Sequence, residues 1–169
     1  MQIEEFNKLP RHQALAMLMQ CCNASRWAQE MVECRPFASL SALQVSSQTI
    51  WAEMREQDFL EAFDGHPKIG DPDSLKLKYN TTKEIASSEQ SGIQHASDQI
   101  IDELASYNQA YLDKFGFIFI VCATGKTANE MLTSIKRRLS NRRQQELALA
   151  ANEQQKITTI RINKLFEHN

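Results

Sequence analysis

The sequence predicts an all-α fold, a helical bundle of roughly eight helices with one short apolar segment that is not helical, near residues 117–123. Two observations favour helices. Only five glycines and four prolines interrupt 169 residues, and between them the apolar residues mostly recur with the period of a helix rather than that of a strand. The length suits one domain with a substantial core, so we expect residues 1–169 to form a single domain.

The N-terminal part of the chain is expected to begin with two helices. Residues 11–22 place apolar side chains on one face, as an amphipathic helix does. Asn23 or Ser25 is a suitable N-cap for a second helix that reaches Cys34. Pro36 lacks the amide hydrogen that a helix interior needs, so the second helix is expected to end before it.

A longer helical segment is expected to begin at Ser39 or Ser41, because either residue is a good N-cap. It ends at Gly65, inside the stretch FDGHPKIGDP of residues 63–72. Residues 71–88 are polar and contain few apolar side chains, so we expect an exposed loop or a short helix there.

The C-terminal half is expected to hold three helices and the apolar segment. Apolar side chains from Ile93 to Phe115 fall on one stripe of a long helix. Residues 117–123, FIFIVCA, form a continuous apolar run that is either extended or a buried turn. Thr127 is placed to cap the next helix, and residues 143–166 form the last one.

The overall charge gives no reason to expect nucleic acid as a partner. Basic residues number 19 and acidic residues 21, so the net charge is -2, whereas nucleic-acid-binding domains are usually basic. One basic cluster lies within residues 136–143, but no aromatic residue follows that would stack on bases, so we interpret it as a solvated helix face. An apolar fraction of 42% with 24% charged residues is typical of a globular protein rather than a membrane span.

The cysteines are predicted to be reduced thiols. They form no C-x-x-C pair, and no histidine stands at the spacing of a zinc finger. The four histidines also lie in four different segments, so no metal site is expected. Acidic residues near the N-terminus and a C-terminus without a targeting sequence favour a cytoplasmic protein.

The stretch GHPKIG, residues 65–70, holds a histidine in a restricted backbone. Pro67 fixes its own φ and disfavours the helical conformation for His66, while the flanking glycines permit sharp turns. An imidazole titrates near neutral pH, which suits it to donate or accept one proton. Two interpretations remain open: a catalytic histidine on a rigid mount, or a loop histidine that closes a turn by hydrogen-bonding a carbonyl.

A second polar patch, SSEQSG, spans residues 87–92. Glu89 and Gln90 stand side by side among small residues, which leave room for a ligand to approach the backbone. The alternative is structural: Ser87 or Ser88 caps a helix, and Glu89 complements the positive end of the helix dipole.

Arg161 is the third candidate. Ile157, Arg161 and Leu165 are spaced four apart, so they share one stripe of the last helix, and we expect this stripe to face inward. A guanidinium pointed toward a core must meet an anion or carbonyl groups to offset its desolvation. Arg161 is therefore part of a buried ion pair or a clamp for a ligand carboxylate.

The chain resembles the OHCU decarboxylase family, where OHCU is 2-oxo-4-hydroxy-4-carboxy-5-ureidoimidazoline. Four features carry the likeness in order along nearly the whole chain: GHPKIG, Glu89-Gln90 followed by Gly92, FGFIFI at residues 115–120, and Arg161. The resemblance implies an all-helical lyase of urate degradation that converts OHCU, a small anionic ureidoimidazoline, into (S)-allantoin and CO2 without a cofactor. Whether it forms a homodimer is left open.

The resemblance also implies site residues. It places the catalytic histidine at His66, the catalytic glutamate at Glu89 and a catalytic arginine at Arg161, with no metal. The substrate-binding residues that it implies are Pro67, then Ala86, Ser87, Ser88, Glu89 and Gln90, and then Phe119, Ile120, Val121, Cys122 and Ala123.

The chain departs from the family at Ile118, where proline is usual, and at Thr124, near which many members have arginine. Two alternative functions therefore stay open. One is a decarboxylase or lyase that acts on a related ureido acid. The other is a non-enzymatic helical binding domain with the same fold.

Overall fold

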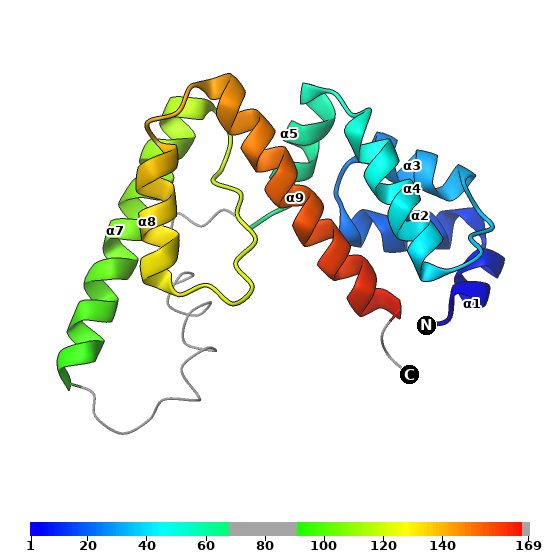
Figure 1. The fold of residues 1–169 in the computed structure, drawn as a ribbon, viewed down its shortest axis with the longest axis horizontal. Coiled ribbons are helices and arrows are strands. Elements are labelled where there is room, and N and C mark those ends of the chain that lie inside the picture. The colour runs from blue at the N-terminus through cyan, green and yellow to red at the C-terminus, as the bar shows by residue number, and fades with distance from the viewer. Residues whose placement is uncertain (68–90, 167–169) are drawn as a thin grey trace. The chain divides into compact units, whose positions relative to one another are not determined.

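The computed structural model of the chain describes residues 1–67 and 91–166, and of residues 91–97 only the backbone. These ranges contain eight α-helices and no strand (Figure 1). The all-α prediction is therefore confirmed. None of the helices within these ranges is long and apolar enough to cross a membrane.

The chain forms two compact units, each made of separate segments. The first comprises Met1–His66, Ile120–Cys122 and Leu147–Asn169, and the second comprises Pro67–Phe119 and Ala123–Glu146. The last helix therefore contributes its first turn to the second unit and the remainder to the first. The expectation of a single domain remains a prediction.

The first unit is built around two tryptophans. Its helices are α1 (Ile3–Lys8), α2 (Arg11–Cys21), α3 (Ser25–Glu33), α4 (Leu40–Ala52), α5 (Glu56–Asp64) and, from Leu147 onward, α9 (Arg143–Phe166). The buried Trp27 indole donates to the Ser47 carbonyl at 3.2 Å, and the buried Trp51 indole donates to the Ala151 carbonyl at 3.0 Å. Each ring thus buries a large apolar area with its N–H satisfied, and the second bond ties α4 to α9.

The cap of α3 differs from the prediction. Ala24 is the N-cap, so the expectation of Asn23 or Ser25 is wrong. Asn23 Nδ2 instead donates to the Glu61 carbonyl at 3.2 Å, and the Ser25 N–H donates to the Glu61 carboxylate at 3.1 Å. The Asn23 side chain and the Ser25 amide thus make tertiary contacts with Glu61, and neither residue is the local cap. They attach the loop before α3 to the end of α5.

The segment predicted as one long helix after Ser39 is two helices. Ser39 caps α4 as expected, because its Oγ accepts a backbone N–H from the first turn at 3.1 Å. The helix then ends, and α5 begins after Arg55, whose N–H donates to the Asp58 carboxylate at 2.8 Å. The prediction of an uninterrupted segment is wrong because the Asp58 carboxylate, which accepts the Arg55 N–H, caps a new helix without glycine or proline.

The second unit contains α7 (Ser91–Phe115), α8 (Ala128–Arg138) and the first turn of α9, and α7 packs against α8. Gly116 follows α7 with φ +78°, the left-handed conformation that favours glycine. Residues 117–123 are not helical, as predicted. Thr127 caps α8 through mutual bonds with Glu130, which confirms that prediction.

A buried charged cluster lies in the second unit. Arg138, 5% exposed, forms a salt bridge of 2.8 Å with the fully buried Glu146, to which the Tyr111 hydroxyl also donates. Burial, and then the bond to Glu146, raise the pKa of the Tyr111 phenol. The Arg138 guanidinium also lies 4.6 Å from the centroid of the Phe119 ring. The solvated-face prediction is therefore wrong for Arg138, because Glu146 compensates its burial.

Candidate active site

The backbone before His66 is set by a close contact. α5 ends at Asp64, and Gly65 keeps an ordinary helical φ of -73°. A Cβ atom built on Gly65 would lie 2.4 Å from the Asn23 Cβ, well inside van der Waals contact. The chain turns here as expected, but the turn does not need the conformational freedom of glycine. Glycine is required because the loop before α3 approaches this backbone closely.

The His66 side chain is half-buried and bonded to α9. Its Nε2 lies 2.6 Å from Oε1 of Gln154, a residue with no exposed surface and 88 positions away in sequence. Gln154 Nε2 in turn donates to Thr158 Oγ1 at 3.3 Å, one helical turn further on. The imidazole is thus held by a distant helix, as a mount requires, and Pro67 beside it is exposed.

The predicted binding stretch of residues 119–123 is anchored by a carboxylate of α9. Glu153 Oε2 accepts the Cys122 N–H at 2.9 Å, and Glu153 Oε1 pairs with Lys156 at 3.0 Å. The Cys122 amide is therefore already engaged within the first unit. Of the five residues in the stretch, two are buried, Phe119 and Ile120, and three are half-buried, Val121, Cys122 and Ala123.

Arg161 lies at the edge of the buried face of α9. The buried positions of that face include Ala150, Gln154, Thr158 and Ile162. Arg161 is half-buried, as are the two residues predicted to share its stripe, Ile157 and Leu165. The prediction that the stripe of Arg161 faces inward is thus wrong by one residue, which corresponds to a rotation of about 100° around the helix axis. Arg161 Nη1 donates to the Cys21 carbonyl at 3.3 Å, and no salt bridge joins it to another described residue.

Two buried thiols stand near Arg161. Burial raises the pKa of Cys21 to about 11 and that of Cys22 to about 12, while the positive charge of Arg161 opposes both shifts. All four cysteines are free, as predicted. The two buried thiols stay protonated at neutral pH, so neither is suited to act as a nucleophile.

One helix, α9, brings together three predicted site segments within the first unit. Gln154 bonds His66, Glu153 bonds Cys122, and Arg161 lies about two turns beyond Gln154 on the same helix. Glu153, Gln154 and Thr158 were not predicted as site residues. For Gln154 and Thr158 the available signal is a pair of polar residues, four positions apart, flanked on the same face by Ala150 and Ile162.

The other predicted binding stretch, residues 86–90, is not among the residues that the structure describes. Glu89 and its neighbours Ala86, Ser87, Ser88 and Gln90 lie outside the described residues. Their assigned roles remain predictions. The two departures from the family pattern do lie within the described ranges, with Ile118 half-buried and Thr124 exposed.

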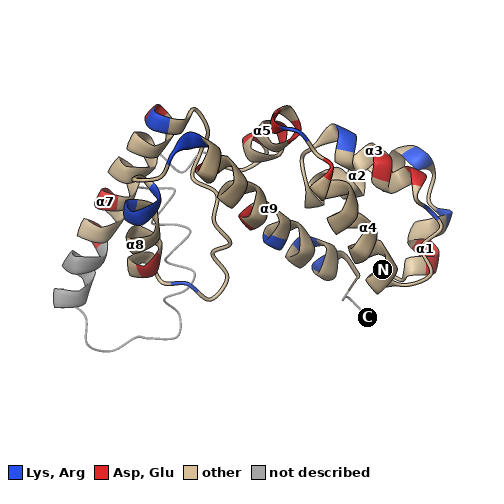
Figure 2. Cartoon of the chain, turned by 45° about the horizontal axis from the view of Figure 1, so that its top comes forward, with Lys and Arg blue, Asp and Glu red and all other residues tan. Residues whose placement is uncertain are grey.

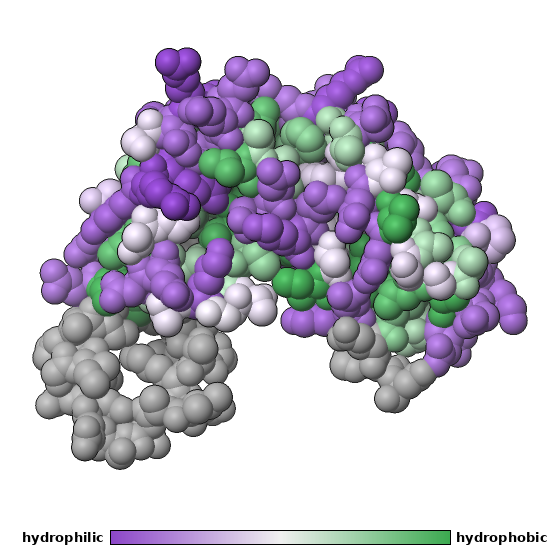
Figure 3. Space-filling view, viewed as in Figure 1, coloured by the Kyte–Doolittle hydropathy of each residue, from purple (hydrophilic) through white to green (hydrophobic). Residues whose placement is uncertain are grey.

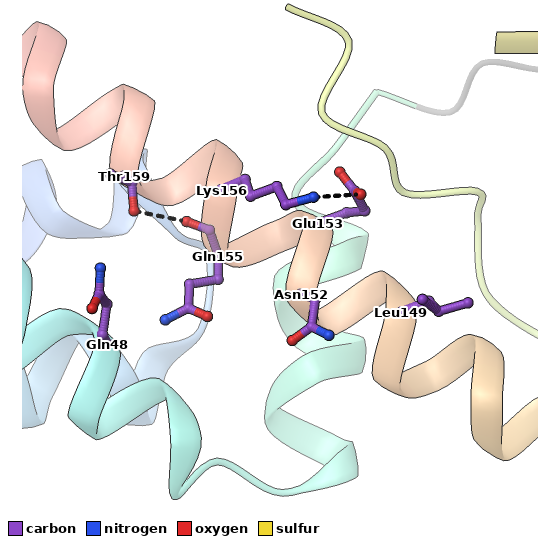
Figure 4. Close-up of a pocket in the computed structure, with 7 residues that line it drawn as sticks. All are labelled: Gln48, Leu149, Asn152, Glu153, Gln155, Lys156 and Thr159. Carbon is purple, nitrogen blue, oxygen red and sulfur yellow. Dashed lines mark hydrogen bonds and ion pairs between the residues drawn. The ribbon is translucent and has the colours of Figure 1, made fainter. Parts of the chain in front are cut away.

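A surface hollow of about 490 Å³ lies elsewhere on the first unit, between α4 and α9. It is lined by Gln48 of α4 and by six residues of α9 between Leu149 and Thr159, as Figure 4 shows. Its lining residues include three amides, one hydroxyl and the Glu153–Lys156 ion pair. Neither His66 nor Arg161 lines it, so this hollow is not the predicted site.

Charges of both signs are interspersed along the helices (Figure 2). On the face drawn in Figure 3, hydrophobic residues occur as separate patches among hydrophilic ones. Within the described residues, no group of three or more histidine, cysteine or acidic side chains is placed to share a metal ion.

A family model of OHCU decarboxylase matches residues 7–163. The chain belongs to the OHCU decarboxylase family. The 2-oxo-4-hydroxy-4-carboxy-5-ureidoimidazoline decarboxylase of Xenopus laevis is 30% identical over 154 residues, 85% of this chain and 78% of that protein. A crystal structure of OHCU decarboxylase in the presence of (S)-allantoin matches with a TM-score of 0.71 and 36% identity, covering 89% of this chain and 96% of that one.

Another member of the family is larger. The uric acid degradation bifunctional protein TTL of Arabidopsis thaliana is 38% identical over 146 residues, which cover 86% of this chain. This chain spans only 45% of the length of that relative. The family match therefore concerns one part of the Arabidopsis protein.

Proposed function

We propose that this chain decarboxylates OHCU to (S)-allantoin and CO2, as a step in urate degradation. The observation that carries the proposal is the family match over residues 7–163. It is supported by the 36% identity to an OHCU decarboxylase whose crystals were studied in the presence of (S)-allantoin.

The chemistry needs few groups. When CO2 leaves C4, the adjacent C5=N bond of the imidazoline ring takes up the electron pair, which leaves a C4=C5 double bond and, once the C4 hydroxyl gives its hydrogen to the ring nitrogen, an enolate oxygen on C4. The substrate thus supplies its own electron sink, the role that pyridoxal or thiamine has in other decarboxylases. The tasks left to the protein are to orient the substrate, to stabilise the developing oxyanion and to protonate one face of C5, the carbon that bears the ureido group.

Three side chains take these roles in the proposal. Arg161 binds the anionic substrate, because a guanidinium matches a carboxylate with two parallel N–H donors. Glu89 orients the substrate or His66. His66 assists decarboxylation by a hydrogen bond and delivers the proton to one face, which makes the product chiral. Residues 86–90, Pro67 and residues 119–123 supply the remaining contacts to the ring and the ureido group.

One contact restricts which backbone amides can stabilise the oxyanion. The Cys122 N–H donates to Glu153 at 2.9 Å and so is not available to the substrate while that bond holds. We therefore assign the oxyanion contact to other amides of residues 119–123. Glu153 would act by fixing the backbone on which those amides lie.

The test uses freshly generated OHCU and follows the optical activity of the allantoin formed. Spontaneous decay gives racemic allantoin, so the proposal predicts that the protein accelerates decay and produces an excess of the S enantiomer. His66→Gln should reduce the rate to near the spontaneous one. His12→Gln, at an exposed position of α2, is the matched control and should keep full activity. A racemic product at the spontaneous rate with the unaltered protein would show a non-enzymatic helical domain instead.

The same assay separates OHCU from related substrates. Competition by allantoin and by other ureido acids ranks them, and tighter binding of a different ureido acid would favour the related lyase. Activity should survive dialysis against a metal chelator. For the location we propose the cytoplasm, and sedimentation would establish whether the chain forms a homodimer.

A further inference from the structure

The hydrogen bonds of Thr158 fix the orientation of the Gln154 amide. The Thr158 hydroxyl donates its only hydrogen to the backbone carbonyl of Gln154 at 2.9 Å. Its oxygen can therefore only accept from the Gln154 side chain, from which it lies 3.3 Å. The NH2 end of the amide must face Thr158, and the oxygen end faces His66.

The donor count of the hydroxyl supports this orientation. A hydroxyl has one hydrogen to donate. Because the Thr158 hydroxyl gives that hydrogen to the Gln154 carbonyl, it has no second hydrogen to offer to a reversed amide.

Water cannot supply the hydrogen bonds that a reversed Gln154 amide would lose. Gln154 has no exposed surface, and Thr158 is 3% exposed. A flipped Gln154 would set its oxygen against the oxygen of Thr158, with no hydrogen between them. Two buried polar groups would then lose their partners, which is a costly arrangement in a protein interior.

Since Oε1 of Gln154 only accepts, the His66 nitrogen at 2.6 Å from it must carry a hydrogen. We infer that Gln154 and Thr158 are positioning residues that hold His66 as the Nε2–H tautomer and so leave proton exchange with the substrate to Nδ1. This inference rests on the proposed function, in which His66 exchanges a proton with the bound ureidoimidazoline.

The proton balance follows directly. In the imidazolium form both ring nitrogens carry hydrogen. CO2 leaves C4, its electron pair forms the C4=C5 bond, and the displaced C5=N pair takes the hydrogen of the C4 hydroxyl, which gives an enolate. Nδ1–H then donates its proton to C5, the carbon that bears the ureido group, while C4–O becomes a carbonyl, and the imidazole returns to the neutral Nε2–H form that Gln154 stabilises. Solvent then restores the proton at Nδ1.

The tautomer can be measured without any activity assay. The full-length chain is labelled with ¹⁵N at histidine, and long-range ¹H–¹⁵N correlation spectra are recorded above the pH at which His66 deprotonates. Loss of signals in His66→Gln assigns the ring. We expect a single neutral tautomer with hydrogen on Nε2. A ring with hydrogen on Nδ1 would overturn the inference.

Variants of the two supporting residues test the positioning role. Gln154→Leu should populate both tautomers and lower kcat on the order of 10- to 100-fold with KM nearly unchanged, because substrate contacts remain while the imidazole loses its fixed orientation. Thr158→Val should move the spectrum in the same direction, and Thr158→Ser, which keeps the hydroxyl, should restore it. Gln155→Leu, the neighbouring glutamine on α9, is the matched control.

The outcomes separate this inference from the proposed function. If the unaltered protein fails to decarboxylate OHCU, the tautomer spectrum still decides which hydrogen His66 carries. If Gln154→Leu does not fold, the spectra of the unaltered protein and of Thr158→Val decide in its place. Unchanged tautomer and unchanged kcat in both variants would refute the positioning role.

Discussion

Replacing Gly65 by alanine tests whether a close backbone approach, rather than flexibility, explains the glycine before His66. The added Cβ would meet the Asn23 side chain at 2.4 Å from its Cβ, 2.9 Å from its Cγ and 3.1 Å from its Nδ2. Either the end of α5 or the loop before α3 has to move. The Asn23 Nδ2 bond to the Glu61 carbonyl, at 3.2 Å, lies at the same point and would be strained or lost.

The expected change in the free energy of unfolding is the sum of two costs and one gain. Overpacking of this kind costs about 1–3 kcal/mol, and loss of one hydrogen bond costs about 1 kcal/mol. Because φ of Gly65 is -73°, alanine adopts this backbone without strain, and its lower freedom in the unfolded chain returns about 0.4–1 kcal/mol. We expect a net loss of about 2 kcal/mol, which lowers the urea midpoint by about 1 M at a typical slope of about 2 kcal/mol/M.

The assay is urea unfolding followed by circular dichroism, arranged as a double-mutant cycle with position 23. Asn23→Ala keeps the Cβ that makes the 2.4 Å contact and should not relieve the clash, whereas Asn23→Gly removes it. In the Asn23→Gly background, Gly65→Ala should cost less than about 0.5 kcal/mol. The close-contact explanation would be refuted if Gly65→Ala lowered the free energy of unfolding equally in the unaltered protein and in Asn23→Gly. It would also be refuted if Gly65→Ala alone left the urea midpoint unaltered.

Three further predictions concern the charges and thiols. Glu146→Gln should lower the free energy of unfolding by about 3–5 kcal/mol in urea titrations, because Arg138 would keep a buried charge without its partner; Glu103→Gln, which breaks a surface pair with Lys136, is the control and should shift the midpoint far less. The thiols of Cys21 and Cys22 ionise at about pH 9 in the unfolded chain but only at about 11 and 12 in the folded protein, so the free energy of unfolding should fall as the pH rises from about 9 to 12. Cys22→Ala should make this fall with pH less steep. Arg161→Lys should raise KM about tenfold with unchanged thermal stability, since a point charge replaces a bidentate fork; loss of folding would assign Arg161 to structure instead.

The sequence was most informative where a helix carries its own start and stop signals. Thr127 and Ser39 are caps whose partners lie within the next turn, so they could be recognised locally. The break before α5 was missed because Arg55 and Asp58 form a cap from residues that are equally at home inside a helix. Asn23 failed as a predicted cap for a different reason. Its partner, the Glu61 carbonyl, is 38 residues away and invisible to local pattern.

Burial of polar residues was the harder problem. Arg138 stands in a basic run that predicts a solvated face, and only the tertiary pairing with Glu146 and Tyr111 places it in the interior. Gln154 and Thr158 were passed over because polar residues are usually exposed. For Arg138 and Gln154 the deciding energy is an ion pair or hydrogen bond to another segment of the chain, Glu146 and His66 respectively, which a single sequence does not display.

The position of Arg161, one residue away from the buried stripe of α9, determines which groups its guanidinium can bind. A fully buried guanidinium would need several protein acceptors to offset its desolvation, which would leave few donors for a ligand. Because Arg161 lies at the edge of the buried face, the residue is half-buried rather than enclosed. Within the described residues, the Cys21 carbonyl is the one hydrogen-bond acceptor that it meets, at 3.3 Å, and this contact takes a single donor of five. Half-burial, together with the lack of a salt bridge to another described residue, thus favours the proposed carboxylate clamp over the buried ion pair.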